Sequence, residues 1–62
     1  MTSIRTEVRE VEKHLKALDS TKEGQIKIAS VTQGMAAEGR FTDNERTIKI
    51  LSIVKNRIIH SA

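Results

Sequence analysis

The sequence predicts an all-α protein, a compact three-helix bundle or helical array that self-associates through its second and third helices. Three observations lead to this prediction. Aliphatic residues recur three and four apart in the first third of the chain, two later segments repeat each other behind a helix-start motif, and Phe41 is the only Phe, Tyr or Trp. A core without large rings favours closely packed helices over a sandwich of sheets.

The chain is short for a fold that must be stable alone. Its 62 residues allow a single domain, 1–62, and a domain of this size buries only about 60% of the surface that its unfolded form exposes. The chain has no cysteine, so disulfides and thiolate metal sites cannot supply additional stability. Association is the remaining remedy, and we therefore expect a homo-oligomer.

The first predicted helix spans about residues 3–18. Its large apolar residues alternate four and three apart, which places them in one narrow stripe of a helix. Nearly all other residues of the segment are polar, as in a helix whose outer face meets solvent. A stripe this narrow suits packing against one or two neighbouring helices. The stripe consists of Ile4, Val8, Val11, Leu15 and Leu18.

The second and third predicted helices, about 21–38 and 43–60, share a pattern. QIKIASVTQG at 25–34 resembles TIKILSIVKN at 47–56, with Ile, Lys, Ile and Ser repeated in place. Each segment follows an S/T-x-x-E motif at the same interval, STKE at 20–23 and TDNE at 42–45. In this motif the first hydroxyl caps the helix N-terminus, so Ser20 and Thr42 are the expected caps. We interpret the repeat as two similar packing surfaces.

A β-strand is the alternative for residues 25–32, because this segment is rich in β-branched residues that partly alternate with polar ones. The preceding cap motif and the absence of an Asn-Gly or Asp-Gly hairpin turn favour a helix. Gly39 suits the left-handed position that ends a helix. The short turn that follows predicts antiparallel second and third helices, with Phe41 folded back over the core.

The third predicted helix has an apolar face that covers about half of its circumference. Such breadth suits a helix contacted on two sides, either within its own bundle or by the bundle and a second copy. Ile53 falls outside this face, either exposed among charged residues or part of a contact surface. The predicted oligomer or partner interface comprises Ile28, Val31, Met35, Ile50, Ile53, Val54 and Ile58.

Basic residues on the third helix suggest nucleic-acid binding as an alternative function. Their spacing forms a stripe opposite the apolar face, where they could follow a phosphate backbone. A solvated polar face is the simpler explanation of the stripe, and the chain fits a helix-turn-helix motif poorly, since Met35 occupies a position that usually holds a small residue. The candidate nucleic-acid contacts are Arg46, Lys49, Asn56, Arg57 and His60.

Other chemistries find little support. His14 and His60 are the only histidines, and neither belongs to a nucleophile–base pattern, so we expect no catalytic, cofactor-binding or metal-binding residues and no enzyme. The N-terminus is charged throughout and no uncharged run is long enough to span a bilayer, which predicts a cytoplasmic protein without membrane partners. The expected function is that of a small regulatory protein that binds another protein.

Overall fold

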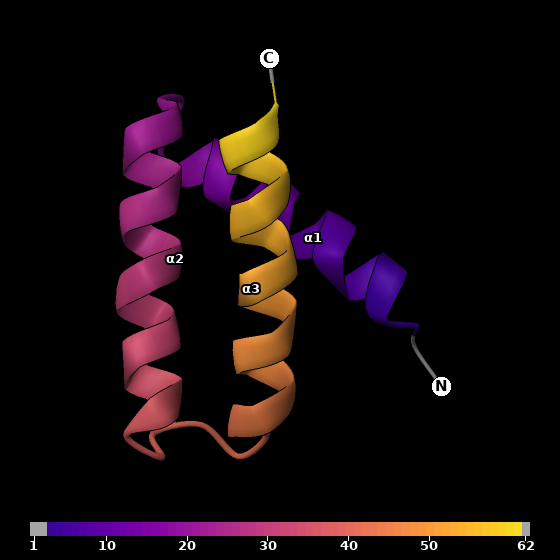
Figure 1. The fold of residues 1–62 in the computed structure, drawn as a ribbon, viewed down its shortest axis with the longest axis vertical. Coiled ribbons are helices and arrows are strands. Elements are labelled where there is room, and N and C mark those ends of the chain that lie inside the picture. Colours follow the sequence, from indigo (N-terminus) through magenta and orange to yellow (C-terminus); the bar gives the residue numbers. More distant parts are fainter. Residues whose placement is uncertain (1–2, 62) are drawn as a thin grey trace.

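The computed structural model describes residues 3–61, which fold into three α-helices (Figure 1). They are α1 (Ile4–Leu18), α2 (Lys22–Ala37) and α3 (Asn44–His60). Every residue from 25 to 32 is helical, and 3–61 contains no strand, so the strand alternative is excluded. The all-α, three-helix prediction is confirmed, and each predicted boundary lies within one residue of the observed boundary.

α2 and α3 lie side by side and antiparallel, and α1 crosses behind α3 in the view of Figure 1. α2 and α3 form the most extensive helix pair, and α1 contacts both. Ala29, which is fully buried, packs against the core residues of α3, and its small side chain lets the two backbones approach closely. Gln33 joins the same two helices, since its Nε2 donates to Ile48 O at 3.2 Å and its Oε1 accepts from Lys55 Nζ at 3.3 Å.

The hydrophobic core is assembled on α3. Val54 has no exposed surface, and Leu51 and Ile58 are also buried. These side chains pack with Val8 and Leu15, the two buried residues of α1, and with Ala29 of α2. Burying a large aliphatic side chain contributes on the order of 1.5–3 kcal/mol, so this face of α3 dominates the stability of so small a chain. As predicted, α3 is covered from two sides.

Two apolar residues differ from expectation. Phe41 is 37% exposed and lies outside the core cluster, so the prediction that it folds over the core is wrong. Ile53 is half-buried and packs against the core instead of standing among solvated charges. Its side of α3 faces α1, because Arg46 and Arg57, which share that side at helical spacing, both pair with glutamates of α1.

The turn between α1 and α2 is held by Asp19. Its Oδ1 accepts from both the backbone N–H of Thr21, at 2.7 Å, and the Thr21 hydroxyl. The hydroxyl bond, and secondarily the backbone bond, hold the pKa of the Asp19 carboxyl below its ordinary value. A Cβ at Gly24 would collide with this carboxylate. Buried Gln25 completes the turn by donating from Nε2 to Asp19 O at 3.0 Å.

Both later helices begin one residue after the position predicted from the cap motif. α2 is capped by Thr21 instead of Ser20, and Thr21 Oγ1 accepts from Gly24 N at 3.1 Å. The N-cap of α3 is Asp43 instead of Thr42, and the Asp43 side chain makes no capping hydrogen bond. The two capping boxes are therefore not formed as predicted.

Gly39 ends α2 as predicted, with φ of +79°. Its N–H donates to Ala36 O at 3.0 Å, and Arg40 N donates to Met35 O at 3.2 Å. This pair of bonds is the Schellman arrangement, which requires a left-handed residue at the position of Gly39. The turn that follows reverses the direction of the chain, so that α3 runs antiparallel beside α2.

Alanine substitutions at Thr21 and Thr42 should have different effects on the free energy of unfolding, because only Thr21 caps a helix. Thr21→Ala removes the acceptor for Gly24 N and the hydroxyl bond to Asp19, and should lower the free energy of unfolding by about 1 kcal/mol. Thr42→Ala should change it little, because no hydrogen bond of Thr42 is present within 3–61. Equal losses in thermal melts would place the start of α3 at Thr42.

The same Thr21→Ala variant should raise the pKa of Asp19 toward its ordinary value, measurable by NMR titration, because the larger cause of the lowering is removed. A depressed carboxyl pKa stabilises the folded state above the ordinary value and loses this contribution as pH falls through the lowered pKa. The wild type should therefore keep its advantage over Thr21→Ala at neutral pH and lose part of it in acid. An unchanged Asp19 titration in the variant would contradict this assignment.

Two glycines should respond oppositely to alanine. Gly34 is an exposed residue in the last turn of α2 with open space where a Cβ would sit, so Gly34→Ala should raise the free energy of unfolding by up to about 1 kcal/mol. Gly39→Ala should lower it by about 1 kcal/mol or more, because alanine is strained at this positive φ. Chemical denaturation measures both changes, and a stabilising Gly39→Ala would refute the described end of α2.

Candidate functional site

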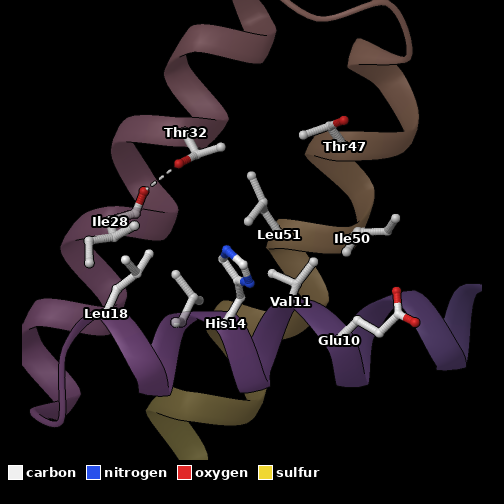
Figure 2. Close-up of a pocket in the computed structure, with 10 residues that line it drawn as sticks. Glu10, Val11, His14, Leu18, Ile28, Thr32, Thr47, Ile50 and Leu51 are labelled. Atoms are coloured by element: carbon white, nitrogen blue, oxygen red, sulfur yellow. Dashed lines mark hydrogen bonds between the residues drawn. The ribbon is translucent and has the colours of Figure 1, made fainter.

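An open groove lies where α1 crosses the α2–α3 pair (Figure 2). We call it the crossing groove. It has a volume of about 400 Å³, and Leu51 of α3 stands near its centre. All three helices contribute aliphatic side chains, so the groove depends on the complete fold. The aliphatic lining residues are Val11, Leu15, Leu18, Ile28, Ile50 and Leu51.

Leu18 is the exceptional member of this lining. It belongs to the same apolar stripe as Val8 and Leu15, which are buried, yet it is 62% exposed. Leu18 is the last residue of α1, where Asp19 turns the chain toward α2, so no further turn of helix covers it. A large aliphatic side chain therefore projects at one end of the groove.

Four polar side chains complete the lining, namely Glu10, His14, Thr32 and Thr47. Figure 2 shows the His14 ring leaning from α1 toward Leu51, with Glu10 at the end of the groove opposite Leu18. The Thr32 hydroxyl donates to Ile28 O at 2.8 Å, which satisfies it within its own helix. The lining contains no Lys or Arg, although the chain has 11 of them, so the groove favours apolar over anionic ligands.

The residues predicted to form an interface differ in how far they are buried and in where they lie. Val54 and Ile58 are buried in the core of the single chain. Ile50 is buried but its edge lines the crossing groove, as does half-buried Ile28. Met35 and Ile53 are half-buried, and Val31 is 57% exposed.

The basic stripe of α3 is partly occupied by α1. Arg46 Nε donates to Glu7 Oε2 at 2.7 Å, and Arg57 Nε lies 2.7 Å from Glu12 Oε1. Both arginines thus hold α1 across α3 instead of forming an unpaired basic surface. The other three residues of the predicted nucleic-acid contact, Lys49, Asn56 and His60, are exposed.

Sequence reasoning found some groove residues but not the groove. Ile28 and Ile50 were expected at an interface, whereas no site was predicted to include His14, and Leu18 was placed in the packing stripe of α1. The crossing of α1 over the α2–α3 pair brings these residues together, and no local pattern encodes that crossing. One signal of the groove was present in the sequence. The similar segments 25–34 and 47–56 place Ile28 and Ile50 at equivalent positions, and both residues line the groove.

Within residues 3–61, no three His, Asp or Glu side chains are grouped so that they could hold a metal ion. None of the three described helices combines the length and apolar character needed to cross a bilayer.

Comparison with known proteins found no match to this chain among protein-family models, curated proteins or solved structures.

The two arginines should matter for stability. The double substitution Arg46→Ala and Arg57→Ala should lower the free energy of unfolding by roughly 1 kcal/mol, because it breaks both ion pairs between α1 and α3. The loss should shrink at high salt, which screens the pairs in the wild type. Lys49→Ala is the matched control, since Lys49 makes no ion pair within the described chain, and should change stability by less than about 0.5 kcal/mol. Equal effects of the double variant and the control in denaturant melts would remove the arginines from the packing of α1.

Proposed function

We propose that this chain is a small, non-enzymatic regulatory protein that acts by binding another polypeptide in the crossing groove. The observation that carries the proposal is the open groove of about 400 Å³, lined by aliphatic residues of three helices. An amphipathic helix can place apolar side chains three and four residues apart into such a groove. The cytoplasmic location expected from the sequence is part of the proposal.

The shape of the groove favours a polypeptide over a metabolite. Small-molecule sites enclose most of their ligand's surface, typically 70–90% or more for a drug-sized compound. The crossing groove is only partly enclosed, and exposed Leu18 stands at one end. A helix can cover the groove and Leu18 together, which removes apolar surface from water on both partners.

The polar residues of the groove support binding rather than catalysis. A nucleophile needs an adjacent base, and that base needs a third group to orient it. In the groove, the Thr32 hydroxyl already donates to Ile28 O, and His14 has no hydrogen bond to an orienting group within the described chain. Thr32 and Thr47 thus present mainly methyl groups and satisfied or solvated hydroxyls to a ligand.

The charge distribution favours a polypeptide over nucleic acid. Binding a phosphate backbone depends on Lys and Arg side chains that neutralise phosphates. The groove lining has none, and on the basic stripe Arg46 and Arg57 pair with Glu7 and Glu12. A nucleic acid would have to displace these two acids.

NMR titration with a designed amphipathic helical peptide tests the proposal, with a peptide of the same composition and scrambled order as control. We expect the amphipathic peptide alone to shift the methyl signals of Val11, Leu15, Leu18, Ile28 and Leu51. Leu18→Lys should weaken this binding, since it places a charge at the end of the groove. Equal shifts with the scrambled peptide, or shifts confined to other faces, would overturn the proposal.

A further inference from the structure

We propose that the partner in the crossing groove is an amphipathic helix that carries a lysine or arginine at one end of its apolar face, and that Glu10 selects it. This inference rests on the proposed function and names the chemistry of the partner. The apolar side chains of the partner helix cover the groove and Leu18, and its cation lies against the Glu10 carboxylate. Glu10 thus determines both the charge of the partner and its position along the groove.

The charge of the groove is concentrated at one end. With His14 neutral, Glu10 carries the only formal charge in the lining, and it lies at the end of the groove opposite Leu18 (Figure 2). The chain has 11 Lys and Arg residues, and none of them lines the groove. A partner therefore meets an aliphatic surface and one negative charge, which favours a cation at that end and disfavours an acid.

Glu10 is also the glutamate of α1 that the chain's own arginines leave unpaired. α1 has three glutamates, and the other two, Glu7 and Glu12, pair with Arg46 and Arg57 of α3. Among the described residues, Glu10 is exposed and makes neither an ion pair nor a side-chain hydrogen bond. Its carboxylate can therefore pair with a partner without first leaving a partner within the chain.

The basic residues of the chain do not prevent this contact. Lys13 lies one helical step from Glu10 but forms no ion pair with it in the described structure, and pairs of this kind on an exposed helix are weak. Arg9 and Lys16 lie roughly 140° or more around α1 from His14, so they are on the side away from the groove. The net charge of +3 is screened beyond about 8 Å at physiological salt. The nearest charge, that of Glu10, therefore decides the contact.

The two ends of the groove also set the spacing that the partner must have. Glu10 and Leu18 are eight residues apart on α1, which at about 1.5 Å per residue is about 12 Å. A helix that follows α1 covers this distance in about two turns. Its cation therefore lies about seven or eight residues from the apolar side chain that meets Leu18, with apolar residues three and four apart between them.

Three amphipathic peptides that differ at one position test the inference. This position has the spacing just given and holds Lys, Gln or Glu, and calorimetric titration measures the dissociation constant of each peptide. We expect the wild type to bind the Lys peptide about two- to fivefold more tightly than the Gln peptide, and the Glu peptide more weakly than either. Glu10→Gln should abolish this order, and Glu10→Lys should reverse it.

Glu23→Lys is the matched control. Glu23 is also exposed and makes no ion pair among the described residues, but it does not line the groove. This substitution changes the net charge as much as Glu10→Lys does, so it should leave the wild-type order of the three peptides unchanged. Higher salt should narrow the preference of the wild type for the Lys peptide, because the contact is exposed.

The outcomes separate the chemistry of the partner from the groove itself. Equal binding of all three peptides by the wild type, with shifted methyl signals of Leu18 and Leu51, overturns the inference and leaves the proposed function standing. A wild type that binds none of the three overturns both. A preference for the Lys peptide that persists in Glu10→Lys, or that Glu23→Lys removes, would assign the selection to other charges and also overturn the inference.

Discussion

Burial of one aliphatic face of α3 beneath both α1 and α2 is the interaction on which the rest of the structure depends. A chain of 62 residues with no cysteine and one phenylalanine must draw its stability from aliphatic packing. Fully buried Val54 lies at the centre of that packing. Because α1 crosses α3 instead of running beside it, the cover is incomplete next to Leu51, and this opening is the crossing groove. The groove thus follows from the same packing that stabilises the fold.

The polar contacts of the molecule mostly fix how the helices meet. Asp19 and Thr21 set the turn into α2, and Gln33 joins α2 to α3 through a backbone carbonyl and Lys55. The ion pairs of Arg46 and Arg57 with α1 give the crossing its lateral position. These contacts lie at the margins of the core, where each contributes modestly to stability but excludes alternative arrangements of the same apolar faces.

The sequence was sufficient to predict the three helices but not the crossing groove. Helical spacing placed the three helices, and Gly39 marked the end of α2, because both signals act within a few residues. The caps were displaced by one position, since Ser20 and Thr21 both carry a hydroxyl and the motif cannot choose between them. The pairs Arg46–Glu7 and Arg57–Glu12 join residues far apart in the chain. They and the groove depend on the direction of α1, which no local pattern specifies.

The crossing groove is a surface of this small chain that combines an aliphatic lining, no Lys or Arg side chain and the exposed Leu18. The most direct measurement is an isotope-filtered NOE experiment on labelled protein mixed with the unlabelled amphipathic peptide. It should show contacts between Leu15 and Leu51 within the protein, and contacts of Val11 and Leu18 with the peptide. Peptide contacts confined to Ile59, or none at concentrations that saturate the shifts of the methyl signals, would contradict the proposed function.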